Sequence, residues 1–257
     1  MLHKTQWLIL TVLFFDTYSI QILKAEERES LYSKISKDYE NFYSKDRLTR
    51  IAIGFSTAAV MANTKIDENI QDWYQDDLRT NNSNNISNQI KKLGERKHVI
   101  PITLLSYGFS YFDPDSIVGE WGTNTLRSLA VGLPVVWSAQ ILSGASRPRE
   151  LRGSDWRPFD DDNGASGHAF VGALPFLNLA KISDNRFIKY TSYLASGLIT
   201  WSRINDDDHF TSQALLGLYL AYESVDAIDE TNASDNKFTI APMVGDKFYG
   251  INVSVTW

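Results

Sequence analysis

The chain has 257 residues, of which 43% are hydrophobic and 22% charged, and it contains no cysteine. A chain of this length can bury most of its apolar surface in one or two globular domains. Its ordinary glycine and proline contents and its lack of cysteine exclude fibrous, disordered and disulfide-stapled classes. The formal net charge of −6 argues against wrapping of nucleic acid, so no nucleic-acid partner is expected.

Residues 1–25 are typical of a secretory signal peptide. Lys4 belongs to a weak basic start, and the apolar run Trp7–Phe15 is shorter than a bilayer span requires. Cleavage after Ala25 would export the rest of the chain. A core helix or a single membrane anchor is the alternative interpretation of this segment.

Helical periodicity dominates the rest of the chain. An amphipathic helix is expected from Leu31 to Phe42, and the nearly all-apolar residues 51–62 are expected to be buried. Residues 80–85, rich in Asn and Ser, are expected to form a loop, because these side chains bond their own backbone in turns. Further helix-length patterns cover residues 99–112, 123–143, 168–182, 186–203 and 209–228.

Several of these helices are apolar enough to suggest a membrane protein. Each pattern is interrupted by Pro134, Pro175, Asn178, Ser196 or a charge within about 15 residues, short of the ~20 that a span requires. The mean hydropathy of −0.24 agrees with this. The sequence therefore favours a helical bundle in water.

The C-terminal segment changes period. From Tyr249 to Trp257 apolar residues alternate with polar ones, which indicates a strand with one wet face. With Gly245 and Asp246 as the turn, residues 238–257 are predicted to form a β-hairpin. Two strands alone are marginally stable, so the hairpin should pack on the helices or make peripheral contact with a membrane. Its aromatic end is similar to the last strand of outer-membrane proteins, although one hairpin cannot close a barrel.

Three short stretches supply groups for chemistry on a phosphate. Arg147 and Arg203 offer planar guanidinium groups that each grip two oxygens. Ser166 and Gly167 precede an apolar helix, whose N-terminus would direct backbone N–H groups at an anion.

Two histidines complete the set. His168 and His209 could divide the work of a covalent step, in which one neutral imidazole attacks phosphorus and one protonated imidazole releases the leaving oxygen.

This pattern resembles the type 2 phosphatidic acid phosphatase (PAP2) superfamily, which is related to bacterial non-specific acid phosphatases and vanadium haloperoxidases. The family signature is Lys-x6-Arg-Pro, Pro-Ser-Gly-His and Ser-Arg-x5-His-x3-Asp. The matching residues, in order, are Arg147-Pro148, Ser166-Gly167-His168, Ser202-Arg203 and His209. The stretches around them are similar to a periplasmic branch of the superfamily.

The resemblance implies a mostly α fold, a PAP2-like helical bundle over residues 26–230 with its catalytic core at about 120–225, followed by the hairpin. It implies localisation in the periplasm of a bacterium, with the outer membrane as a further possible site of association. It also implies catalysis without a metal or other cofactor. The partner would be a phosphate-containing small molecule or lipid.

The resemblance also assigns roles. His209 would be the catalytic nucleophile that forms a phosphohistidine, and His168 the general acid. The phosphate oxygens would be bound by Arg147, Arg203, Ser166 and Gly167.

Three positions depart from the family pattern. Gln140 replaces the lysine, Ala165 the proline, and Gln213 the aspartate that orients the nucleophile. Residues 209 and 213 share a helix face, so Gln213 could still hold the ring tautomer without supplying charge. Gln140 could still donate one hydrogen bond to phosphate.

Two hypotheses follow from these departures. The first is an exported phosphatase for a phosphomonoester or a lipid phosphate. The second is a catalytically weak envelope protein that binds phosphate or lipid head groups. A vanadium haloperoxidase is a distant third.

Overall fold

The computed structural model describes residues 30–235, 238–245 and 248–255. The predicted signal peptide, residues 1–25, lies outside the described residues, as does Trp257. The chain falls into two compact units, Met1–Ser36 and Lys37–Trp257, and all of the chemistry considered below lies in the second.

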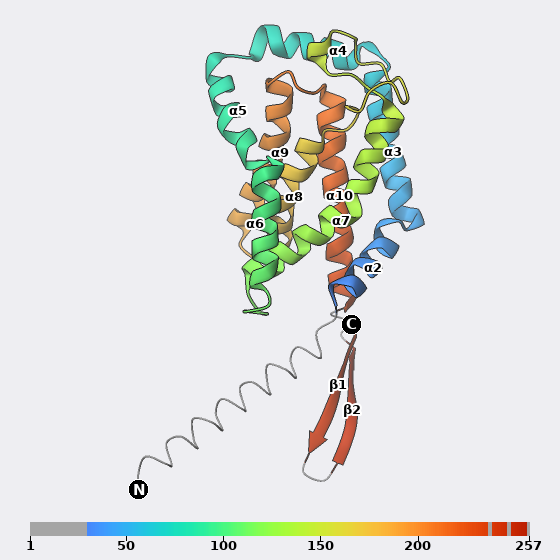
Figure 1. Ribbon diagram of the computed structural model, residues 1–257, viewed down its shortest axis with the longest axis vertical. Coiled ribbons are helices and arrows are strands. Elements are labelled where there is room, and N and C mark those ends of the chain that lie inside the picture. The colour runs from blue at the N-terminus through green and yellow to red at the C-terminus, as the bar shows by residue number, and fades with distance from the viewer. Residues whose placement is uncertain (1–29, 236–237, 246–247, 256–257) are drawn as a thin grey trace. The chain divides into compact units, whose positions relative to one another are not determined.

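Helices make up almost all of the described chain (Figure 1). In chain order they are α2 (Leu31–Phe42), α3 (Lys45–Ala62), α4 (Lys65–Trp73), the π-helix η1 (Tyr74–Leu78), α5 (Asn81–Leu93), α6 (Arg96–Phe109), α7 (Ile117–Ser143), the 3-10 helix η2 (Pro148–Glu150), α8 (Gly167–Ile182), α9 (Arg186–Asn205) and α10 (Thr211–Asp235). The predicted helix at Leu31–Phe42 is confirmed, and α6 to α10 confirm the five later patterns, with helix ends that differ by up to seven residues.

The prediction that prolines interrupt the apolar helices is wrong. Pro134 lies inside α7, which runs for 27 residues, and Pro175 lies inside α8. A proline frees the carbonyl four residues before it. The carbonyl of Ala130, which Pro134 leaves free, accepts a hydrogen bond from the Tyr39 hydroxyl at 2.9 Å. Within the described residues, α7 is the one helix long and apolar enough to cross a membrane, and half of its apolar window is buried.

The predicted loop at residues 80–85 is also wrong, because α5 begins at Asn81. Thr80 and Ser83 form a capping box: the Thr80 hydroxyl accepts from the Ser83 N–H at 3.1 Å, and the Ser83 hydroxyl accepts from the Thr80 N–H at 2.9 Å. The polar composition that suggested a loop instead satisfies the free N–H groups of a helix start.

The apolar stretch 51–62 is only partly buried. Ile51 and Ala58 lie in the core, whereas Ile53 and Val60 are 63% and 58% exposed. A straight helix of 3.6 residues per turn can press only one stripe against its neighbours, so the other apolar side of α3 faces outward.

Helix α8 is the centre of the bundle and packs against α7, α9 and α10. Phe170 and Leu174 of α8 are fully buried, together with Val131 of α7 and Leu220 of α10. Burial of each such side chain contributes about 1.5–3 kcal/mol. The same helix begins at Gly167, so its packing fixes the floor of the site described below.

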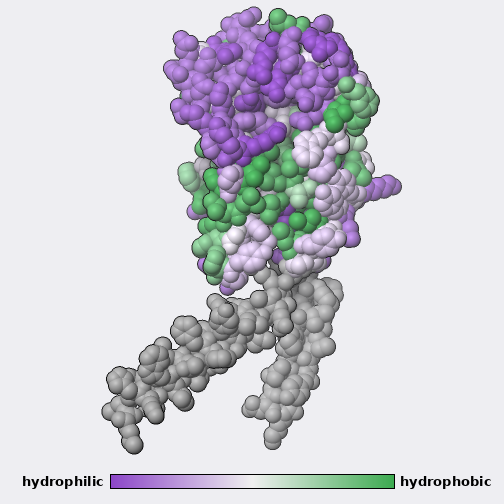
Figure 2. All heavy atoms as spheres, viewed as in Figure 1, coloured by the Kyte–Doolittle hydropathy of each residue, from purple (hydrophilic) through white to green (hydrophobic). Residues whose placement is uncertain are grey.

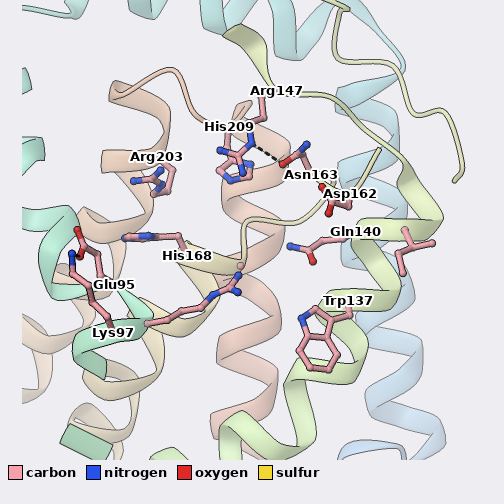
Figure 3. Close-up of a pocket in the computed structure, with 13 residues that line it drawn as sticks. Glu95, Lys97, Trp137, Gln140, Arg147, Asp162, Asn163, His168, Arg203 and His209 are labelled. Carbon is pink, nitrogen blue, oxygen red and sulfur yellow. Dashed lines mark hydrogen bonds and ion pairs between the residues drawn. The ribbon is translucent and has the colours of Figure 1, made fainter. Parts of the chain in front are cut away.

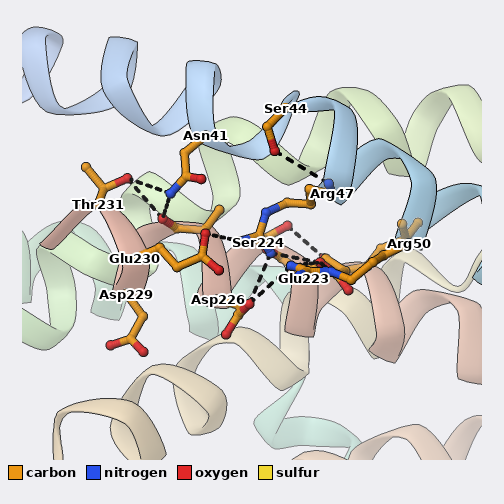
Figure 4. A network of polar contacts seen from close by, with 12 residues as sticks. Asn41, Ser44, Arg47, Arg50, Glu223, Ser224, Asp226, Asp229, Glu230 and Thr231 are labelled. Carbon is orange, nitrogen blue, oxygen red and sulfur yellow. Dashed lines mark hydrogen bonds and ion pairs between the residues drawn. The ribbon is translucent and has the colours of Figure 1, made fainter. Parts of the chain in front are cut away.

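A charged cluster fastens α3 to α10 (Figure 4). Arg47 is 1% exposed and donates to the Glu223 carboxylate at 2.8 Å and to the Glu223 carbonyl at 2.9 Å. Arg50 also binds Glu223, and Asp226 bridges Arg47 to Lys181 of α8. Three helices are thereby joined through one set of ion pairs.

The predicted fold class, a helical bundle with a C-terminal β-hairpin, requires correction. Residues 30–235 contain helices and no strand, so the fold is that of a helical bundle alone. Strands β1 (Phe238–Gly245) and β2 (Phe248–Val255) pair antiparallel, Phe238 with Val255, and pair only with each other among the described residues. No sheet therefore forms part of the packed domain, because a two-stranded ladder provides no core of its own.

Candidate active site

A cavity of about 640 Å³ opens among α6, α7, α8 and α9 (Figure 3). Six of the eight predicted site residues line it, namely Gln140, Arg147, Gly167, His168, Arg203 and His209. Ser166 and Gln213 are buried behind its wall. The fold therefore gathers two imidazoles and two guanidinium groups, distant along the chain, around one polar hollow.

Arg147 is positioned by the turn that follows α7. Gly144 caps α7 with φ +55°, and a Cβ there would lie 1.7 Å from the Arg157 carbonyl oxygen, so only glycine fits. The Arg147 Nε then donates to the Asn163 amide oxygen at 2.6 Å, and its backbone N–H donates to the Glu150 carboxylate at 3.0 Å.

His209 is positioned by the turn between α9 and α10. The N–H groups of Asp208 and His209 both donate to the Arg203 carbonyl, at 3.1 and 3.2 Å, so the turn folds back on the end of α9. The start of α10 is held by Asp67 of α4, which accepts from the Ser212 N–H at 2.9 Å. The two ends of the turn are thus fixed independently.

Gln213 fixes the tautomer of His209. Its amide nitrogen donates to the Ser146 carbonyl at 2.8 Å, and its oxygen accepts from the Phe210 N–H at 3.1 Å. The same oxygen lies 3.0 Å from His209 Nδ1, so Nδ1 carries the proton and Nε2 keeps its lone pair. If the amide were turned over, its NH2 group would face the Phe210 N–H and the Nδ1 side of His209. Gln213 thus lies in hydrogen-bond contact with His209, and its role as the orienting residue stays a prediction.

The environment keeps His209 neutral. Burial lowers its pKa to about 3, and Arg147 acts in the same direction, whereas the Gln213 hydrogen bond opposes the shift. His209 is 5% exposed. A neutral ring with a free Nε2 lone pair has the properties of a nucleophile at any pH above about 4.

The surroundings of His168 also favour the neutral ring. Burial lowers its pKa to about 4, with Arg203 contributing in the same direction. Its Nε2 lies 2.9 Å from the Lys91 carbonyl, so that nitrogen carries the proton of the neutral ring. A general acid requires the doubly protonated ring, and a bound phosphate dianion would favour it by its negative charge.

Ser166 and Gly167, at the start of α8, differ in whether their polar groups are free to bind an anion. The Ser166 hydroxyl caps the helix by accepting from the Ala169 N–H at 3.2 Å, and its backbone N–H donates to the Gln213 carbonyl at 2.9 Å. Ser166 therefore holds the helix start rather than facing the cavity with these groups. Gly167 lines the cavity at the first helical residue, where a backbone N–H is free to meet an anion.

The Gln140 side chain forms a hydrogen bond within the protein. Its amide nitrogen donates to the Ala165 carbonyl at 2.8 Å, so one of its two N–H groups supports the loop that precedes α8. The residue lines the cavity but supplies no charge there.

Asp208 lies against the guanidinium groups. It forms ion pairs with Arg203 and Arg149, and Arg147 Nη1 lies 3.7 Å from its carboxylate. Asp206 caps the C-terminus of α9, and Asp208 contacts the guanidinium groups of Arg203 and Arg149.

The sequence motifs missed other cavity residues. These are Glu95, Arg96 and Lys97 at the start of α6, Trp137 and Ile141 of α7, and Asp162 and Asn163 of the following loop. The α6 residues precede the family signature by more than forty positions, so no local spacing points to them. Across the described part of the chain, no cluster of three or more His, Cys, Asp or Glu side chains could hold a metal ion.

A second hollow of about 690 Å³ lies beside the first, between α6, α7 and α8. It is walled by apolar side chains that include Val99, Trp121 and Leu179. Lys92 and His98 line this hollow, and Glu95 and Lys97 line the polar cavity, so residues around the start of α6 contribute to both. We call it the apolar groove.

The comparisons with known proteins concern the fold. No protein-family model matches the chain, and no curated protein sequence matches it. The crystal structure of a transmembrane PAP2-type phosphatidylglycerolphosphate phosphatase from Bacillus subtilis matches with a TM-score of 0.50 and 12% sequence identity, covering 79% of this chain and 94% of that one. The chain therefore has the fold of a PAP2-type phosphatase, as its three motifs predict.

Proposed function

We propose that the protein is a phosphatase that hydrolyses a lipid phosphate through a phosphohistidine on His209. The observation that carries this proposal is the His209–Gln213 arrangement, which leaves Nε2 unprotonated in a cavity that Arg147 and Arg203 also line. A phosphate dianion would be held by Arg147, Arg203 and the free N–H of Gly167.

The reaction has two steps. In the first, His209 Nε2 forms a bond to phosphorus while the bond to the ester oxygen breaks, and His168 gives its proton to the departing alcohol. In the second, water attacks phosphorus and gives a proton to His168, the bond between phosphorus and His209 Nε2 breaks, and inorganic phosphate leaves. His168 therefore needs a proton that its pKa of about 4 does not provide near neutral pH. Binding of the dianion must raise that pKa before the ester bond breaks.

The apolar groove supports a lipid as the substrate. It is lined by α6, α7 and α8, which also line the phosphate cavity, and its walls could bury an acyl chain whose head group lies between the arginines. The matching solved structure is named a phosphatidylglycerolphosphate phosphatase, which is consistent with this substrate class. We propose that the chain acts at a membrane surface on the exported side, in a periplasm.

A binding protein without turnover is the second candidate. It is favoured by the absence of a carboxylate on His209 and by Asp208, which occupies the guanidinium groups. Such a protein would keep phosphate or lipid head groups in the same cavity.

Hydrolysis by the purified protein separates the two candidates. Phosphate release is measured from phosphatidic acid in vesicles and from p-nitrophenyl phosphate, with His209→Ala and His168→Ala as matched variants. The phosphatase proposal expects release by the wild type, loss of at least about a hundredfold in both variants, and a phosphohistidine that is labile in acid. Wild type and variants that are equally inert would leave the binding protein.

The Gln213→Asp variant tests whether the missing carboxylate beside His209 limits turnover. A carboxylate would stabilise the positive charge that the ring gains when Nε2 bonds to phosphorus, so turnover should rise. An unchanged or lower rate would show that the pocket is adapted to glutamine, because Gln213 also holds Phe210 and Ser146.

A further inference from the structure

Arg96 is a cation that the site does not yet account for. It is the first residue of α6, and it lines the phosphate cavity. Among the described residues its side chain has no ion pair or hydrogen bond, whereas Arg147 and Arg203 both lie against Asp208. A guanidinium group that faces a polar hollow without a carboxylate partner is suited to an anion from outside.

The guanidinium of Arg96 reaches the start of α8. A Cβ built on Gly167 would lie 2.7 Å from Arg96 Nη2 and 3.3 Å from the Gln140 amide nitrogen. Arg96 therefore comes to the same point of the cavity wall as Gln140, although it arrives from a different helix. This point is the N-terminus of α8, where the backbone also favours an anion.

We propose that Arg96 supplies the phosphate-binding cation that Gln140 does not. Gln140 stands where the PAP2 pattern has lysine, and its amide is bonded to the Ala165 carbonyl. Arg96 restores the positive charge from the opposite wall, so three guanidinium groups rather than two surround the anion. Because Gly167 has no side chain, the guanidinium can lie directly over the helix start.

This inference deepens the proposed function and rests on the same cavity, but its test measures binding rather than turnover. The probe is inorganic phosphate, titrated into the purified full chain by calorimetry at low salt. Arg96→Ala should weaken binding about tenfold, and Arg96→Lys should recover part of the loss because it keeps the charge but not the planar fork. The double variant Arg96→Ala with Gln140→Lys should bind better than Arg96→Ala alone, since a lysine at 140 replaces the charge.

Two controls separate a specific contact from general electrostatics. Arg186→Ala removes an exposed charge at the opposite end of α9 from Arg203 and should leave phosphate binding within about twofold of wild type. Lys97→Ala removes the charge next to Arg96. The Lys97 ammonium is paired with Glu95 at 2.5 Å, so this variant should weaken phosphate binding much less than Arg96→Ala does.

The outcomes are distinct. Equal losses in Arg96→Ala and Lys97→Ala, or no loss in Arg96→Ala, would overturn the role of Arg96. Failure of Gln140→Lys to rescue would show that the two positions do not share one task. If phosphate binds with the expected pattern but no hydrolysis occurs, the role of Arg96 is supported and the phosphatase proposal is overturned. If the wild type binds no phosphate, both proposals are overturned.

Discussion

His209 and His168 place opposite protonation demands on one small cavity. Burial and the nearby guanidinium groups favour the neutral ring at both positions, with pKa values of about 3 and about 4. In the proposed reaction, that environment suits His209 as the nucleophile and works against His168 as the acid. The substrate's own charge must resolve the conflict, because a dianion beside His168 offsets the effect of Arg203. Catalysis of this kind is coupled to binding of a dianion rather than a monoanion.

The low histidine pKa values predict a stability that declines in acid. An unfolded histidine titrates near 6.5, so between that pH and the folded values the unfolded chain binds more protons. The free energy of unfolding should therefore fall as the pH is lowered from about 6.5 towards 4, by up to about 1.4 kcal/mol per pH unit for each histidine. Urea unfolding at several pH values would measure the slope, and His209→Asn should make it shallower. The same slope in the variant would contradict the buried neutral ring.

Asp208 predicts a second effect, on affinity. Its carboxylate occupies Arg203 and Arg149 and lies near Arg147, so an incoming phosphate must displace it. Asp208→Asn should lower the KM for a phosphate ester by about three- to tenfold, because a neutral amide competes less well for guanidinium groups. A steady-state comparison with Asp207→Asn, whose carboxylate bonds Gln71 instead, provides the matched control. A raised KM in Asp208→Asn would mean that the carboxylate holds the arginines in place.

At the scale of residues, the sequence predicted which side chains line the cavity but not the ion pairs and contacts that they form. Arg147, His168, Arg203 and His209 line one cavity as the motifs indicate. The ion pairs of Asp208 and the approach of Arg96 to Gly167 join residues that no local pattern relates, since they depend on how α6 and the turn after α9 pack against α8. Such contacts follow from the tertiary fold and have no spacing of their own.

At the scale of elements, the helices are joined by buried polar bonds as well as by apolar packing. Arg127 of α7 binds the fully buried Asp38 of α2 through two hydrogen bonds of 2.7 Å, and Arg47 binds Glu223. Buried pairs of this kind add little over an apolar core, but removal of one partner leaves an uncompensated charge.

The α3–α10 cluster therefore predicts a large loss of stability on truncation. Arg47→Ala should lower the free energy of unfolding by about 3–5 kcal/mol, because it leaves the buried Glu223 carboxylate with only the half-exposed Arg50 as a partner. Arg50→Ala, which removes a partner that is 45% exposed, should cost much less. Chemical denaturation of both variants makes the comparison, and similar losses would show that burial of the pair does not matter.

Helix positions were predictable, and helix ends and interruptions less so. The apolar windows of α6 to α10 follow a 3.6-residue period that local sequence records. Thr80 and Ser83 were interpreted as loop residues, although the same composition caps a helix. Pro134 was interpreted as a break, because local sequence does not show that the freed Ala130 carbonyl is satisfied by Tyr39, which lies ninety-one residues before Ala130.

At the scale of the whole chain, polar and apolar surfaces are segregated. In the view of Figure 2, hydrophilic residues gather around the end that carries α4, and apolar residues gather below them over α6. Leu105 of α6 is 75% exposed and Leu194 of α9 is 62% exposed. Apolar surface on this scale is unusual for a protein surrounded by water and marks a contact with a partner or a lipid.

A lipid contact predicts sedimentation with vesicles. The purified chain should bind phosphatidylcholine vesicles, and the double variant Leu105→Ser with Leu194→Ser should bind several-fold less, because each exposed leucine contributes apolar area to the contact. Circular dichroism would verify that the variant keeps its helices. If both proteins stay in the supernatant, the apolar surface serves a contact other than lipid.

The Asp67 bond to the start of α10 limits how small a working version of this protein can be. Every signature residue lies between positions 140 and 213, yet the helix start beside the nucleophile is capped from α4, 145 residues earlier in the chain than Ser212. A fragment trimmed to the signature would retain the reactive groups and lose their anchor. The minimal functional unit is thus defined by hydrogen bonding across the bundle, and gene fragments chosen by motif alone should yield inert protein.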